Sequence, residues 1–154
     1  MADAVYITRN TVFSAATGAK TVLKLITPTA FGIEIHEIGV SMDGVTSSAV
    51  PATVETFTSD ETTAGTGGGT AVTTQIRGAT IAHGLTVGQN FTAEGTTYTI
   101  QRGWFVPQYM GLLVVQNPLG LGCNSPAGTA DSFGIRINTT ATVNVLAYIV
   151  WSRS

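Results

Sequence analysis

No segment of this chain sustains the spacing of about 3.6 residues between apolar positions that an amphipathic helix requires. Short runs rich in Thr, Val and Ile are instead separated by Gly and Pro, as is typical of β-strands joined by turns. About eight to ten such runs, spaced roughly ten residues apart, are typical of an antiparallel sandwich or barrel. We therefore expect an all-β protein, an antiparallel β-sandwich that is jelly-roll-like and has about eight to ten short strands.

The run over residues 31–42 carries a change of face. Ile33 and Ile35 share one parity, whereas Ile38 and Val40 share the opposite parity. Because side chains alternate with a period of two along a strand, the apolar face changes side only where an extra residue is inserted. The pattern predicts a β-bulge around residues 36–37.

Other local signals predict turns, loops and a buried strand. Asp43 and Gly44, flanked by strand patterns, predict a tight hairpin. The apolar run over residues 109–115 is short and bounded by turn residues, so we expect a strand that is buried on both faces. The glycine-rich residues 62–70 are expected to be either mobile or tightly packed against a neighbouring segment.

The last run, residues 141–151, is apolar on both faces. One face carries alternate residues from Val143 to Trp151, and the other is enriched by Leu146, Tyr148 and Val150. A sandwich strand normally alternates between an apolar face toward the core and a polar face toward water. Either a loop or a second subunit is expected to cover the second face.

The organisation expected is one β-sandwich domain over residues 20–154, preceded by an N-terminal arm or edge strand over residues 1–19. The first residues lack a basic segment followed by an apolar core, so no signal peptide is expected. We expect synthesis in a cytoplasm.

Charge is scarce in this chain. Only 10% of the residues are charged and 44% are hydrophobic, whereas a soluble domain commonly carries about 25% charged residues. A membrane-spanning helix needs about 20 consecutive apolar residues, and the run at 109–115 is too short. Basic residues are scattered singly, which argues against nucleic acid as a partner. The missing charge predicts surface that meets other protein.

Chemistry-bearing residues are few. His36 and His83 form no His-x-His pair, and Cys123 is a lone cysteine, so we expect no metal site and no cofactor. No G-x-S-x-G motif is present. Glu34 and Glu94 are the one plausible strand-borne carboxylate pair for glycoside cleavage, and pairing with basic side chains is the better interpretation. We expect no enzyme.

Five segments taken in order carry a resemblance to a known family. They are FGIEIHEIGVSMDGVTSSAVPATVE, TSDETTAGTGGGTAVTTQIRG, FTAEGTTYTI, GLLVVQNPLG and FGIRINTTATVNVLAYIVW. The chain resembles, over about residues 20–151, a family of small β-sandwich proteins of tailed bacteriophages that are described as virion or capsid decoration proteins. These segments mark strands and turns rather than catalytic chemistry.

The resemblance implies a jelly-roll-like structural subunit on the exterior of the virion. It implies a homo-oligomer, with a trimer favoured, that coats or cements the phage head by binding the major capsid protein. It offers no catalytic residues. Two alternatives remain open, a receptor- or glycan-binding head-fibre or adhesin domain with surface aromatic residues such as Trp104, and another head or tail structural protein.

Candidate interface residues come from the arm and from the second face of the last strand. They are Val5, Ile7, Val12, Phe13, Leu146, Tyr148 and Val150. A charge introduced at Tyr148 is expected to break oligomers if that face is an interface, and to unfold the monomer if it is core.

Overall fold

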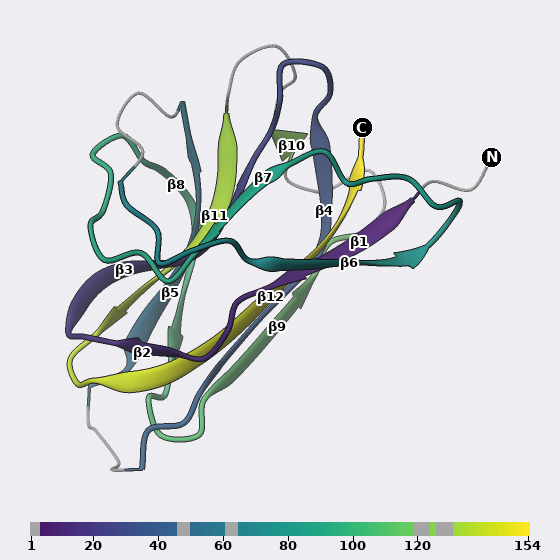
Figure 1. Cartoon of the computed structure of the whole chain (residues 1–154). Coiled ribbons are helices and arrows are strands. Elements are labelled where there is room, and N and C mark those ends of the chain that lie inside the picture. The colour runs from purple at the N-terminus through teal and green to yellow at the C-terminus, as the bar shows by residue number, and fades with distance from the viewer. Residues whose placement is uncertain (1–3, 46–49, 61–64, 119–123, 126–130) are drawn as a thin grey trace.

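The computed structural model describes residues 4–45, 50–60, 65–118, 124–125 and 131–154, and within these every regular element is a β-strand (Figure 1). The strands are β1 (Val5–Arg9), β2 (Phe13–Ala15), β3 (Gly18–Ile26), β4 (Ile33–Met42), β5 (Ala52–Ser59), β6 (Val72–Arg77), β7 (Thr86–Gln89), β8 (Thr99–Val106), β9 (Leu112–Gln116), β10 (Asn124–Ser125), β11 (Ser132–Thr139) and β12 (Val143–Arg153). Their pairs are antiparallel and form a seven-stranded and a five-stranded sheet. The antiparallel β-sandwich predicted from the sequence is confirmed.

Four strand pairs are nested along the chain. They are β1 with β12, β3 with β11, β4 with β9, and β5 with β8. Additional pairing of β12 with β4 and of β11 with β5 joins them into the rows β1-β12-β4-β9 and β3-β11-β5-β8. β6 extends the first row beyond β1, and β7 extends the second beyond β3. The first and last long strands are therefore neighbours in the middle of one sheet.

The N-terminal segment contributes to this sheet. β1 lies between β12 and β6, whereas β2 pairs with β12 alone. Asn10, which lies between β1 and β2 in the sequence, is also bonded to β12, because its main-chain N–H donates to the Ala147 carbonyl at 3.2 Å. Within the expected arm or edge strand of residues 1–19, the described part thus adds two strands to the sandwich.

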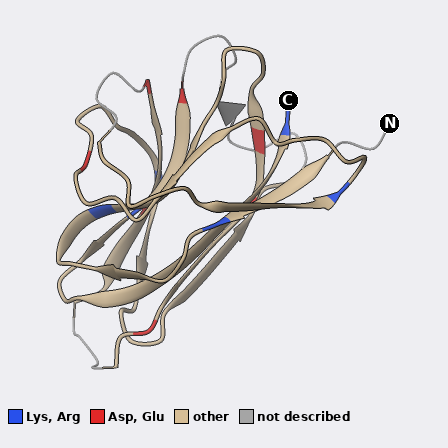
Figure 2. Ribbon diagram, viewed as in Figure 1, with Lys and Arg blue, Asp and Glu red and all other residues tan. Residues whose placement is uncertain are grey.

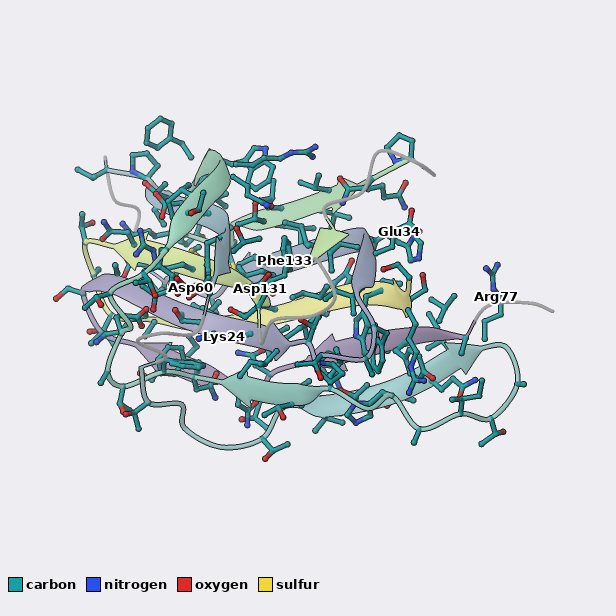
Figure 3. All side chains as sticks on the ribbon, turned by 90° about the horizontal axis from the view of Figure 1, so that it is seen from above. Lys24, Glu34, Asp60, Arg77, Asp131 and Phe133 are labelled. Atoms are coloured by element: carbon teal, nitrogen blue, oxygen red, sulfur yellow. The ribbon has the colours of Figure 1, made fainter. Side chains whose placement is uncertain are left out.

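The core lies between the two sheets and is continuous. Phe133 of β11 (Figure 3) is fully buried there, and so is Trp151 of β12. Trp151 stacks on Tyr6, with ring centroids 4.7 Å apart, and its Nε1–H donates to Thr8 Oγ1 at 2.9 Å. The inward face of β12 is buried at each alternate residue from Val143 to Trp151, as the sequence predicted.

The predicted β-bulge is present in β4. Val150 of β12 pairs with Glu37, but the next residue, Trp151, pairs with Ile35. His36 is therefore the extra residue, and it brings Ile35 and Ile38 to the same buried face. The change of parity in the sequence located this bulge correctly.

The predicted hairpin at Asp43 and Gly44 is wrong. β4 ends at Met42 in the seven-stranded sheet, and β5 begins at Ala52 in the five-stranded sheet. β4 and β5 therefore belong to different sheets and are not the two strands of a hairpin. The Asp43 carboxylate instead accepts the main-chain N–H of Asn144 at 2.9 Å.

The prediction that residues 109–115 form a strand buried on both faces is also wrong. β9 begins at Leu112, pairs with β4, and leaves Leu112 70% exposed and Val114 48% exposed. Its other face, with Leu113 and Val115, packs against the core. A continuous apolar run does not distinguish a strand buried on both faces from a strand whose second face is exposed.

Of the glycine-rich residues 62–70, the structure describes residues 65–70, and these pack against residues 88–93. The N–H of Thr66 donates to the Ala93 carbonyl at 2.7 Å, and the N–H of Gly68 donates to the Gln89 carbonyl at 2.7 Å. A Cβ at Gly68 would lie 2.7 Å from the Asn90 carbonyl oxygen, so this close approach requires glycine.

In the described part of the chain, no helix is long and apolar enough to span a bilayer.

Candidate interaction surface

The chain itself covers the outer face of the five-stranded sheet around Phe57 of β5, whereas Ile100 and Phe105 of β8 are 42% and 80% exposed. Tyr98 packs edge-on against Phe57, with ring centroids 4.7 Å apart, and Arg136 lies over the Tyr98 ring at 5.0 Å. Arg136 also forms a salt bridge with Glu55 at 2.9 Å. The main-chain N–H of Thr21 donates to the Glu94 carboxylate at 2.6 Å. Residues 90–98 and these charged groups therefore cover the part of that face around Phe57.

On the outer face of the seven-stranded sheet, the described part of the chain leaves apolar side chains of β9 and β12 exposed. We call this surface the open face, and it consists of Ile7, Arg9, Glu37, Gly39, Ser41, Leu112, Val114, Gln116, Leu146, Tyr148 and Val150. Leu146 is 47% exposed. Figure 2 shows how sparsely charged residues are distributed over the ribbon. A contiguous exposed apolar patch of this kind commonly marks an interaction site.

Strand register arranges the open face in three rows across β1, β12, β4 and β9. The rows are Arg9-Tyr148-Gly39-Val114, Ile7-Val150-Glu37-Gln116 and Leu146-Ser41-Leu112. Residues directly opposite each other on one face of neighbouring strands are in contact range, so the residues of each row are neighbours across the sheet.

Small residues hollow out the middle of the open face. Gly39 and Ser41 of β4 lie between larger side chains on β12 and β9. Two adjoining hollows, of about 310 and 340 Å³, share Ser41, Leu112 and Leu146 in their linings. The surface is therefore an apolar trough rather than a flat sheet, and a projecting side chain of a partner can fill it.

A hydrogen-bonded group lies beside this trough. The Tyr148 hydroxyl donates to Glu37 Oε1 at 2.5 Å, and Gln116 Nε2 donates to Glu37 Oε2 at 2.8 Å. The Tyr148 ring lies over Gly39, where an added Cβ would overlap the Cε1 atom of the ring. Burial, followed by the hydrogen bond to Glu37 and the charge of its carboxylate, raises the pKa of Tyr148 to about 12.

This pKa predicts how Tyr148 responds to alkaline pH. Because the folded-state pKa is raised from 10.0 to about 12, the contribution of Tyr148 to stability is complete below pH 10 and is lost as pH rises toward 12. Ultraviolet titration of phenolate should show a late-titrating tyrosine that disappears in Tyr148→Phe. Gly39→Ala should displace the ring and bring the late titration earlier. An unchanged titration curve in Tyr148→Phe would contradict the assignment.

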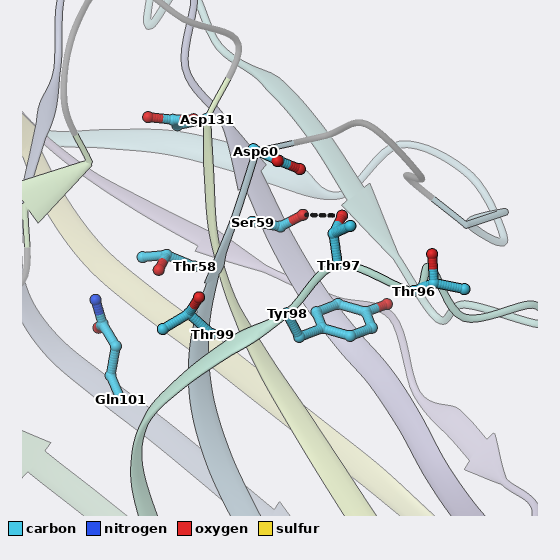
Figure 4. A pocket seen from close by; sticks show the side chains of 9 residues that line it. All are labelled: Thr58, Ser59, Asp60, Thr96, Thr97, Tyr98, Thr99, Gln101 and Asp131. Atoms are coloured by element: carbon cyan, nitrogen blue, oxygen red, sulfur yellow. Dashed lines mark hydrogen bonds between the residues drawn. The ribbon is translucent and has the colours of Figure 1, made fainter.

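A second, polar hollow of about 520 Å³ lies where β5 and β8 approach the start of β11 (Figure 4). Asp60 and Asp131 are both part of its lining and lie near each other (Figures 3 and 4). Ser59 and Thr97 are joined across it by a hydrogen bond of 3.4 Å between their hydroxyls. Its lining is hydroxyl and carboxylate rather than apolar, so it suits a polar ligand.

Known proteins offer little that resembles this chain. No known family matches the sequence, and no curated protein sequence matches it. Among solved structures, turnip yellow mosaic virus is similar over 99% of this chain and 81% of that chain, with 11% identity and a TM-score of 0.30. The VP2 protein of infectious bursal disease virus is similar over 97% of this chain and 39% of that chain, with 11% identity and a TM-score of 0.24. Scores of this size do not establish a shared fold.

The structure brings four of the seven predicted interface residues together. Ile7, Leu146, Tyr148 and Val150 lie on the open face. Val12 is 61% exposed and lines the same trough at its end.

The remaining two predicted residues lie toward the core. Val5 is 8% exposed and counts among the buried residues, and Phe13 is partly buried and packs against the core. Sequence reasoning missed Leu112 and Val114, because their run was interpreted as buried on both faces. It also missed Gly39 and Ser41, although their parity after the bulge places them on the outward side.

The other residues considered for chemistry have structural partners. His36 Nε2 is 2.8 Å from the Ser152 hydroxyl, and His83 Nδ1 accepts the N–H of Leu85 at 3.1 Å. Among the residues that the structure describes, no three His, Cys, Asp or Glu side chains gather as a metal site would need. Cys123 lies outside the described residues.

Proposed function

We propose that this chain is a structural protein of a tailed-phage virion, a capsid decoration or cement protein that self-associates and binds the head lattice. The observation that carries the proposal is the open face. It exposes Leu112, Val114 and Leu146 of two strands joined by β4 in one sheet, whereas the chain covers the outer face of the other sheet around Phe57. The resemblance to small phage virion proteins supports the same conclusion.

The energetics favour a protein partner for this surface. Apolar area contributes about 25 cal/mol for each Å² removed from water. The centres of protein interfaces are poor in charge and rich in apolar and aromatic side chains. Leu146, Val150 and Tyr148 have this character, and they project from a rigid strand in the middle of the sheet. Binding would therefore require little ordering of the chain.

We assign the sandwich to the jelly-roll class. The nested pairs β1/β12, β3/β11, β4/β9 and β5/β8, joined into two four-stranded rows, support the assignment. Jelly rolls occur in viral capsid proteins, but also in lectins and cupins, so the fold alone does not select a function.

The partners follow from the proposed role. They are further copies of the chain, with three copies favoured by the resemblance, and the major capsid protein on the exterior of the head. The contact region would extend from the open face to the N-terminal segment through Ile7 and Val12. No catalytic step or cofactor is part of this role.

The test places a charge at the centre of the open face. Leu146→Asp should convert the purified oligomer to monomer and abolish binding to undecorated capsids, because a carboxylate would be buried without a partner. Sedimentation and a capsid-binding assay measure both effects. Asn138→Asp, which adds the same charge at an exposed position of β11, is the matched control and should change neither. A wild-type protein that is monomeric at micromolar concentration and does not bind capsids would refute the proposal.

A second candidate function is glycan or receptor binding in the polar hollow. The carboxylates of Asp60 and Asp131, with the neighbouring hydroxyls, favour this alternative. Among the aromatic residues, Tyr98 is engaged by Phe57 and Arg136 and Trp104 is partly buried against the core, whereas Phe105 is 80% exposed. Binding on a glycan array that is lost in Asp131→Asn but kept in Leu146→Asp would support this role over the structural one.

A further inference from the structure

The open face carries one cation and one anion within its three rows. Arg9 is exposed in the first row, and Glu37 lies in the second row, two strands away. Within the described part of the chain, Arg9 has no ion-pair partner. Glu37 is held by the donors Tyr148 and Gln116 and, as a carboxylate with about four lone-pair sites, can accept further hydrogen bonds.

These two charges restrict what can cover the open face. Covering Arg9 with a purely apolar surface would leave a desolvated cation unpaired, which is strongly unfavourable. A suitable partner must therefore present an anion opposite Arg9 and a cation opposite Glu37, and apolar side chains elsewhere. The open face itself has this composition.

We infer that the open face pairs with the open face of a second copy across a two-fold axis, so that Arg9 of each copy meets the partner's Glu37. This inference rests on the proposed function for self-association, and adds the surface, the symmetry and the charged contacts. A contact of this kind is isologous, since the same patch is used by both copies. It sets the number of copies at two for this contact, in place of the three that the resemblance favours.

The register of the sheet supports the arrangement. Strands lie about 4.8 Å apart and rise about 3.4 Å per residue, so Arg9 and Glu37 are separated by roughly 12 Å on the flattened sheet. Their midpoint lies on β12 between Tyr148 and Val150. An axis through that point, in the plane of the contact, places Arg9 over the partner's Glu37.

The same axis also matches the apolar side chains. It carries Leu146 onto the partner's Val114 and brings Leu112 close to the partner's Ser41, where the trough is hollow. Two sheets packed face to face in this way resemble the inside of a β-sandwich, in which side chains interdigitate between layers about 10 Å apart.

The test uses charge reversal with rescue by mixing. Arg9→Glu alone opposes two carboxylates at each of the two symmetry-related contacts, and Glu37→Arg alone opposes two guanidinium groups there. Each variant should therefore dimerise at least roughly tenfold more weakly than the wild type. Mixing the two variants should restore a heterodimer, because the Glu that replaces Arg9 in one copy then meets the Arg that replaces Glu37 in the other, and the two original groups meet at the second contact. Both contacts join opposite charges only if the copies dock as inferred.

The double variant, Arg9→Glu with Glu37→Arg, is the stricter form of the rescue. It exchanges the two charges on every copy, so each contact again joins a cation to an anion and the dimer should return. Arg102→Glu on β8 of the other sheet is the control and should leave dimerisation unchanged.

Sedimentation equilibrium and native mass spectrometry give the readout. A dimer in the double variant, with monomers or weak dimers in each single variant, supports the inference. A trimer, or a dimer that neither reversal weakens, overturns it while leaving the proposed function standing if capsids are still bound. A dimer that is rescued in the double variant but never binds capsids supports the inference and overturns the proposed function.

Discussion

Replacing Trp151 with alanine should lower the free energy of unfolding by about 3 to 5 kcal/mol, the largest loss expected from a single change. Trp151 is fully buried between the sheets and stacks on Tyr6 at 4.7 Å. Its removal leaves a cavity that the rigid strands around it cannot close. Urea denaturation at one fixed protein concentration measures the effect, because oligomerisation makes apparent stability depend on concentration.

Two further variants separate the causes. Val150→Ala, on the opposite face of the same strand, should cost much less, since Val150 is only half-buried in the monomer. Trp151→Phe keeps most of the ring and removes the N–H donor to Thr8, which retains a hydroxyl partner in Thr73 at 2.9 Å. Its loss should be intermediate. Equal losses for Trp151→Ala and Val150→Ala would contradict the packing described for β12.

Asn10→Ala should lower the free energy of unfolding by about 3 kcal/mol. The Asn10 side chain is fully buried where the chain passes from β1 to β2. Its Oδ1 accepts the N–H of Ala147 at 2.8 Å, and its Nδ2 donates to the Val145 carbonyl at 3.2 Å and to Asn90 Oδ1 at 3.0 Å. Alanine leaves the Ala147 N–H without its Asn10 acceptor and removes a donor from the Val145 carbonyl, and a buried group left unpaired costs about 1 to 3 kcal/mol.

Hydrogen exchange adds a local readout for Asn10. The Ala147 amide should exchange faster in Asn10→Ala than in the wild type, beyond what the change in global stability accounts for. Asn90→Gly is the control, because Asn90 has φ of 53°, which glycine adopts without strain, and its loss leaves both Asn10 contacts to β12 intact. A loss of stability in Asn90→Gly as large as that in Asn10→Ala would show that the β12 contacts are not what Asn10 provides.

Local patterns in the sequence predicted those features that depend on one strand alone. The parity change between Ile35 and Ile38 located the bulge, because a period of two is a property of the strand itself. The two faces of β12 were assigned correctly for the same reason. Asp43 and Gly44 misled, because a turn signal carries no information on whether the next strand joins the same sheet or the opposite one.

The candidate site shows the same division. Ile7, Leu146, Tyr148 and Val150 were predicted from their parity and apolar character, whereas Arg9 was not considered as part of the surface. Arg9 becomes important only because β1 pairs with β12, which places it on the same face as Glu37. No local spacing relates residues 9 and 37.

The sequence by itself determined an all-β chain with too little charge for an ordinary surface, and a last strand that is apolar on both faces. Only the tertiary structure decided which face remains open. Residues 90–98 fold over the five-stranded sheet, while the described chain leaves the other sheet's Leu112 and Leu146 exposed. The physical reason is that side-chain alternation depends only on neighbouring residues along the strand. Coverage of a face depends instead on where the strand pairing places segments that are distant in sequence.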